Sequence, residues 1–151
     1  MQYPVLFKNP REQKLLQLIM ELCRIPAPTG REQKRWEFCR GWLTDAGCTD
    51  VIVDSALNVI VPYNLQKKDI VVIAAHMDTV LPDMEPMVMR VENGRLYCPG
   101  AGDDTASLGI PSAAIGTYVG GGAHTRDEYL DIMSLPKGLK IADKLLDRYI
   151  I

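Results

Sequence analysis

Long apolar runs are absent from this sequence, and none approaches the about 20 consecutive apolar residues that a membrane-spanning helix needs. The first residues, MQYPVLFKNPREQK, lack the basic and then apolar order of a signal peptide. A strong net charge is missing too: the formal value is −2, whereas a nucleic-acid partner favours a basic patch. We therefore expect a cytoplasmic protein that binds neither membranes nor nucleic acid.

Cysteine and histidine are both scarce. The four cysteines form no CxxC pair, so we expect reduced thiols that are mostly structural, as in a reducing compartment. They are Cys23, Cys39, Cys48 and Cys98. The only histidines are His76 and His124, so the surroundings of each are informative.

Hydrophobic periodicity predicts three helices in a chain of 151 residues, a length typical of one domain with a substantial core. The first covers residues 11–24, with Leu15, Leu18, Ile19 and Leu22 on one face. For the second we expect Thr29 as the N-cap of a capping box with Glu32. Its inner face would carry Trp36, Cys39 and Leu43, and Gly47 would follow its end. The last helix is expected over residues 137–151.

Short β-branched runs between turn formers predict the strands. They fall at residues 50–54, 58–63 and 129–135, with a hairpin over 87–98 whose Asn93-Gly94 pair is typical of a type I′ turn. The stretch DIVVIAAH, residues 69–76, is apolar without alternation, as in a strand buried on both faces of an α/β sheet. Helices alternating with strands indicate an α/β sandwich.

His76 follows that apolar stretch directly, where α/β sheets collect functional residues. His76 and Asp78 are two positions apart and would share a face of the strand. A carboxylate beside an imidazole is the arrangement typical of a metal-bound histidine. A surface histidine beside an unrelated aspartate fits the same spacing.

Two further segments combine glycine with polar residues. Asp103 and Asp104 follow CPGAG, and two adjacent carboxylates in a tight turn favour a compensating cation. A solvated turn with an N-capping aspartate is the alternative. Three glycines precede His124, which suits either a metal site or an ordinary loop.

Taken in order, HMDTV, CPGAGDDTASLGI and GGGAHTRDEYLDIMSL resemble the M20 family of metallopeptidases, which includes carboxypeptidases, tripeptide aminopeptidases and amino-acid deacylases. IPAPTGRE and DSALNVIV are similar to its N-terminal region. The resemblance implies a zinc-exopeptidase catalytic domain: an α/β three-layer sandwich around a mixed, mostly parallel sheet. It also implies two bridged divalent metals, usually zinc, with cobalt or manganese as alternatives, and substrates such as small peptides or N-acyl amino acids.

By this resemblance, His76 would bind one metal. Asp78, as a catalytic residue, would orient the His76 ring. Asp103 would bridge both metals, and His124 would bind the other. Thr125 and Arg126 lie beside His124 and could contact a substrate carboxylate, although a surface role for Arg126 is equally open.

The family's Glu-Glu pair, which supplies the general base and a metal ligand, is missing, as are a further aspartate ligand of the family and its lid domain. No carboxylate lies between Asp104 and Asp127. The sequence therefore resembles a single partial catalytic domain, with an N-terminal part over 1–110 and a C-terminal part over 111–151. We expect the two parts to join across a large internal deletion near residues 109–113.

Each metal would then keep two of its three protein ligands, and we expect weak metal binding and little or no activity. The carboxylates that could substitute are Asp83, Glu85, Asp104, Asp127 and Glu128. The alternative function is a non-catalytic metal-binding or interaction module on the same core. Strands lost with the deletion would expose a sheet edge, through which a homodimer could form.

Overall fold

The computed structural model describes residues 4–63, 66, 72–82, 85, 87–106 and 118–149. Three α-helices form in this part of the chain: α1 (Pro10–Cys23), α2 (Gln33–Asp45) and α4 (Leu135–Tyr149). Two short helical segments of other types accompany them: the π-helix η1 (Ala101–Ala106) and the 3-10 helix η2 (Ile132–Ser134). None of these helices is long and apolar enough to cross a membrane.

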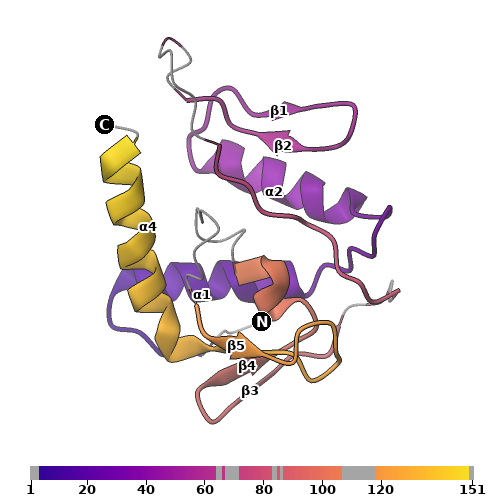
Figure 1. The fold of residues 1–151 in the computed structure, drawn as a ribbon, viewed down its shortest axis with the longest axis vertical. Helices are drawn as coiled ribbons and strands as arrows, with labels where there is room; N and C mark the ends of the chain where they lie inside the picture. The colour runs from indigo at the N-terminus through magenta and orange to yellow at the C-terminus, as the bar shows by residue number, and fades with distance from the viewer. Residues whose placement is uncertain are drawn as a thin grey trace.

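The strands form two small antiparallel sheets (Figure 1). One pairs β1 (Ile52–Val53) with β2 (Val59–Ile60). The other has the order β3-β4-β6-β5, with β3 (Arg90–Glu92), β4 (Arg95–Tyr97), β5 (Gly120–Gly121) and β6 (Tyr129–Asp131). The predicted hairpin is confirmed: Asn93 and Gly94 both have positive φ, as a type I′ turn requires.

The core lies between α1, η1 and the inner face of the four-stranded sheet, and α4 closes one side (Figure 1). Leu96 and Leu130 are register partners on β4 and β6, and both are fully buried. Leu16 and Ile19 of α1 belong to the same hydrophobic cluster, as does Ala142 of α4. This cluster joins segments on both sides of the predicted deletion.

The first helix is confirmed in its extent and its inner face, which buries Leu15, Leu18, Ile19 and Leu22. Its start follows from Asn9, whose side chain accepts a hydrogen bond from the Arg11 amide, and from a proline in the first turn. The predicted last helix is also present, and it begins two residues earlier than expected because the 3-10 turn η2 leads directly into it. As a consequence, the strand expected over 129–135 ends at Asp131.

The predicted capping box of the second helix is wrong. Glu32 is the N-cap of α2, and the Thr29 hydroxyl donates instead to a carboxylate oxygen of Asp78, 2.6 Å away. The Thr29 hydroxyl bonds to this distant carboxylate and does not cap the helix backbone, because the fold brings Asp78 next to the turn that contains Thr29. Gly47 has φ +95°, in agreement with its expected place after the helix.

The mostly parallel three-layer sandwich is likewise wrong for the described residues. All ladders there are antiparallel, apart from one isolated parallel bridge between Pro28 and Thr79. Residues 72–76 are not a strand, and Val72 is 78% exposed. An apolar run becomes a buried strand only when neighbouring strands flank it, and the described sheets provide none. Residues 67–71 and the junction near 109–113 lie outside the described residues.

Candidate metal centre

The segment that carries His76 is fastened to the ends of α1 and α2. The Thr79 amide donates to the Ala27 carbonyl at 2.7 Å. Arg35 of α2, which is fully buried, donates to three carbonyls: those of Met77 (2.8 Å), Leu22 (3.1 Å) and Ile25 (2.7 Å). Burial lowers the pKa of this guanidinium. Arg35 thus holds residues 76–78 in place without any strand partner.

Asp78 contacts His76 as the spacing predicted. Its Oδ1 lies 3.0 Å from His76 Nδ1, and its Oδ2 accepts the Thr29 hydroxyl. That hydroxyl is the main reason why the pKa of Asp78 is lowered from its ordinary value. An ionised carboxylate on Nδ1 fixes the ring orientation and leaves Nε2 directed away from the backbone segment.

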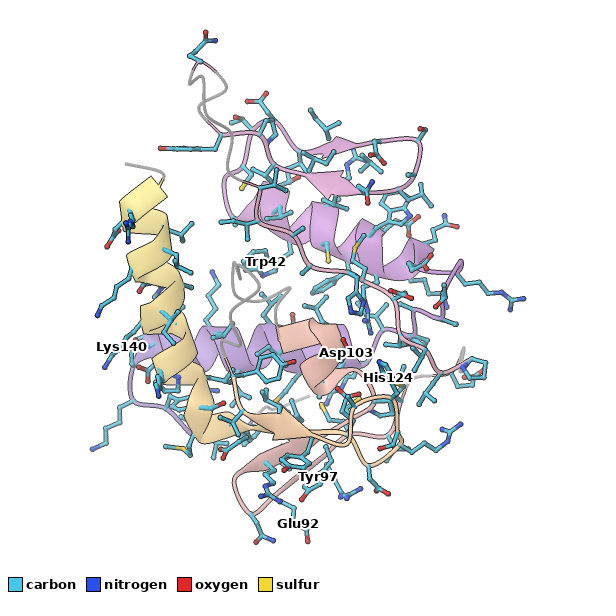
Figure 2. The ribbon with its side chains drawn as sticks, viewed as in Figure 1. Trp42, Glu92, Tyr97, Asp103, His124 and Lys140 are labelled. Atoms are coloured by element: carbon cyan, nitrogen blue, oxygen red, sulfur yellow. The ribbon has the colours of Figure 1, made fainter. Side chains whose placement is uncertain are left out.

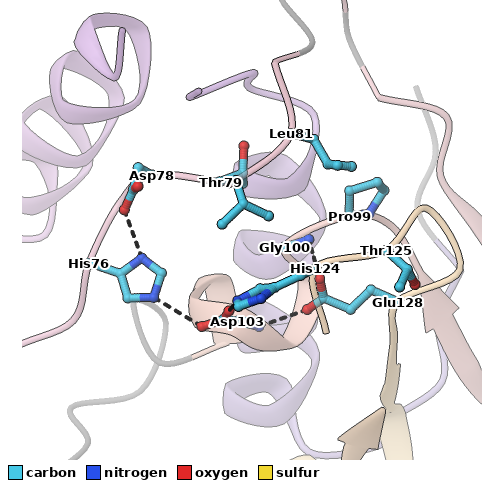
Figure 3. Close-up of a pocket in the computed structure, with 11 residues that line it drawn as sticks. His76, Asp78, Thr79, Leu81, Pro99, Gly100, Asp103, His124, Thr125 and Glu128 are labelled. Carbon is cyan, nitrogen blue, oxygen red and sulfur yellow. Dashed lines mark hydrogen bonds and ion pairs between the residues drawn. The ribbon is translucent and has the colours of Figure 1, made fainter. Parts of the chain in front are cut away.

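Asp103 lies between the two histidines (Figure 3). Its Oδ1 is 3.0 Å from His76 Nε2, and its Oδ2 is 2.6 Å from His124 Nε2. Figure 2 shows Asp103 on η1 beside His124, which belongs to the loop between β5 and β6. Two histidines that are 48 positions apart in the sequence therefore meet at one carboxylate.

The His76 ring makes two contacts that a neutral imidazole cannot both satisfy as a donor. Both nitrogens of His76 face carboxylate oxygens, which only accept hydrogen bonds when ionised. A neutral imidazole has a single N–H, so one of the two contacts opposes lone pairs unless the ring is cationic or a cation lies between the atoms. The surroundings of His76 are therefore suited to positive charge, either on its ring or on a bound metal ion.

The His124 loop is held in a strained conformation. His124 has φ +66°, in the left-handed region that costs a non-glycine residue about 1–3 kcal/mol and is concentrated at functional sites. The Thr125 hydroxyl closes the turn by donating to the Gly122 carbonyl at 2.6 Å. Gly122 has φ +70°, and a Cβ there would lie 3.2 Å from the Asp127 carbonyl oxygen, so only glycine fits easily.

Glu128 has a role that the sequence did not reveal. Its side chain is 3% exposed, and its carboxylate accepts hydrogen bonds from the amides of Gly100 (2.7 Å), Gly102 (2.8 Å) and Asp103 (2.8 Å). In the sequence, Glu128 was one of five carboxylates that could substitute for a missing metal ligand, and no spacing distinguished it from the others.

The other proposed substitutes do not join the two histidines in the part of the chain described. Asp127 is 85% exposed and lies 3.7 Å from Arg90, and Glu85 is exposed. Asp83 and the side chain of Asp104 lie outside the described residues. Thr125 lines a pocket together with His76, Asp78, Asp103, His124 and Glu128 (Figure 3), whereas Arg126 is exposed.

The side chains at this centre are of the types that bind divalent metals, but each metal position would have too few of them. Imidazole nitrogens and carboxylate oxygens are ordinary zinc ligands. Within the described ranges, no group of three or more histidine, cysteine or acidic residues is arranged so that it could hold one metal ion. The reason is geometric: Asp103 separates the rings and offers one oxygen to each. We call His76 with Asp103 the first half site, and His124 with Asp103 the second half site.

The family resemblance found in the motifs has no support from comparison with known proteins. No family model matches the sequence. A search of curated proteins gives no significant match.

Proposed function

We propose that the chain is a reduced M20-type metallopeptidase or amidohydrolase domain with two bridged half sites for divalent metal ions, zinc first, with cobalt and manganese as alternatives. The observation that carries this proposal is the Asp103 carboxylate, with one histidine Nε2 on each of its oxygens. The family resemblance leads us to expect this arrangement, in which an aspartate bridges two metals and each metal is bound by one of the histidines. A cytoplasmic location is part of the same proposal.

The residues have distinct tasks in this proposal. His76 and His124 each hold one ion, and Asp103 holds both. Asp78 keeps the His76 ring in place, and Thr29 in turn keeps Asp78 oriented and ionised. When bound, the metals would supply Lewis-acid activation of an amide carbonyl and of water. The substrate class that matches this chemistry is small peptides or N-acyl amino acids.

Low activity follows from what the sequence lacks. General-base assistance is worth about 10²–10⁴ in rate, and no glutamate stands in the region where the family places its base. We expect little turnover of dipeptides or N-acyl amino acids with added zinc, manganese or cobalt. Rapid hydrolysis that His76→Ala abolishes would contradict this expectation.

A non-catalytic metal-binding or interaction module is the second candidate function. It is favoured by the two-ligand half sites and by the exposed apolar side chains of Val72 and Ile73. Zinc binding without turnover distinguishes this module from a peptidase.

Calorimetry on metal-free protein tests the proposal, with His76→Ala and His124→Ala in parallel. We expect two weak zinc sites in the wild type and the loss of a different one in each variant. Arg126→Ala is a suitable control, because this residue lies two positions after His124 and is exposed. Zinc binding that neither histidine variant alters would overturn the proposal.

A further inference from the structure

Glu128 connects the two segments that form the second half site. It lies at the end of the loop that carries His124, directly before β6. Its carboxylate reaches across to the other segment and accepts hydrogen bonds from the amides of Gly100, Gly102 and Asp103. Its carbonyl oxygen also accepts from the Cys98 amide at 3.1 Å, so backbone and side chain fasten the same junction.

The backbone of residues 100–103 is shaped around this carboxylate. Gly100 adopts φ +77°, which allows successive amides to turn toward one point. At Gly102, a Cβ would lie 3.2 Å from Glu128 Oε1 and 3.1 Å from Tyr118 Cε2. Converging backbone amides form an anion-binding concavity, and hydrogen bonds to an ionised acceptor are stronger than neutral ones. Here the anion is a side chain of the protein itself.

We infer that Glu128 is a positioning residue that sets the distance between Asp103 and His124, and thereby the affinity of the second half site for a divalent metal ion. One of its three donors is the amide of Asp103 itself. His124 is held by the same loop in a strained conformation that needs a fixed frame. This inference rests on the proposed function, because it concerns metal binding.

The first half site depends on other contacts. His76 is placed by Asp78, and its segment is held by Arg35 and by the bond between Thr79 and Ala27. A change at Glu128 should therefore affect the two half sites unequally, although both use Asp103. A merely structural role would weaken both together.

The test uses Glu128→Gln, which keeps the shape of the side chain but turns an NH₂ group toward backbone donors. Asp127→Asn is the matched control, since it removes the same charge from the adjacent, exposed position. Zinc calorimetry on metal-free protein should show one of two ions bound about 10- to 100-fold more weakly in Glu128→Gln. The other ion, and both ions in Asp127→Asn, should bind as in the wild type.

A double-mutant cycle identifies the half site that is affected. Glu128→Gln should have little further effect in a His124→Ala background and its full effect in a His76→Ala background. Amide proton shifts of Gly100, Gly102 and Asp103 provide a readout without metal, and these shifts should move in Glu128→Gln but not in Asp127→Asn. If Glu128→Gln does not fold, Glu128→Asp is judged by the same criteria.

Failure of the inference is distinguishable from failure of the proposed function. Wild-type protein that binds no zinc overturns both. Wild-type protein that binds two ions, together with Glu128→Gln that binds them equally well, overturns the inference alone. Equal weakening of both ions, in step with a lower melting temperature, also overturns it, since that pattern indicates general destabilisation.

Discussion

Replacing Arg35 by methionine should destabilise the fold, because this one side chain joins three segments. Methionine keeps most of the side-chain volume and removes the guanidinium. The carbonyls of Leu22, Ile25 and Met77 then lose their shared donor. The wild-type fold therefore depends on a buried cation that has carbonyl partners in place of a carboxylate.

The magnitude follows from the burial of these acceptors. A buried acceptor left without a partner costs about 1–3 kcal/mol. Only the bond to Leu22 is fully buried, so water can replace the other two in part. Removing the cation also recovers its desolvation cost, to which the Arg35 Nε contributes, because it is buried and lacks a hydrogen-bond partner among the described residues. We expect a net loss of about 2–4 kcal/mol in the free energy of unfolding, from a total of about 5–15 kcal/mol.

Urea denaturation followed by circular dichroism measures this loss. Arg40→Met is the control, since Arg40 is exposed on the same helix and its replacement should change stability by about 0.5 kcal/mol or less. Arg35→Lys should be nearly as destabilising as Arg35→Met, because an ammonium cannot reproduce the planar fork. Full stability in Arg35→Lys, or a loss below about 1 kcal/mol in Arg35→Met, would refute the reasoning.

Three further predictions concern thiols, glycines and assembly. Burial raises the pKa of Cys39 to about 11, so its thiol stays protonated and resists alkylation at pH 8 in the folded protein, becoming reactive only as the pH approaches 11. Mass spectrometry after iodoacetamide treatment checks this, and rapid labelling at pH 8 without unfolding would contradict it. Gly102→Ala should lose about 1–3 kcal/mol because its Cβ meets Glu128 and Tyr118, whereas Gly41→Ala, in open space on α2, should gain about 0.5–1 kcal/mol. Equal effects in urea titrations would be the contrary result. The edge strand β3 is exposed at every residue, so light scattering should detect a dimer at high concentration, and a monomer throughout the range would exclude pairing through this edge.

Local signals in the sequence were sufficient for the first and last helices and for the hairpin. The spacing of Leu15, Leu18, Ile19 and Leu22 defined the buried face of α1, and Asn93-Gly94 defined the turn of the hairpin. These features depend on neighbours a few positions away. The same is true of the contact between His76 and Asp78.

Features that depend on distant neighbours were predicted poorly. DIVVIAAH has the composition of a buried strand, but residues 72–76 have no flanking strands in the described structure. Thr29 had a suitable local capping partner, and its hydroxyl nevertheless bonds to Asp78, 49 positions away. Glu128 was one of five carboxylates considered as substitute metal ligands, because only the fold shows three amides converging on it.

The most direct test of the central claim is anomalous X-ray scattering at the zinc edge from crystals soaked in zinc. If Asp103 bridges two half sites, two zinc peaks will flank its carboxylate, one beside His76 and one beside His124. Absence of zinc at Asp103, or a single ion held by other residues, would contradict the account.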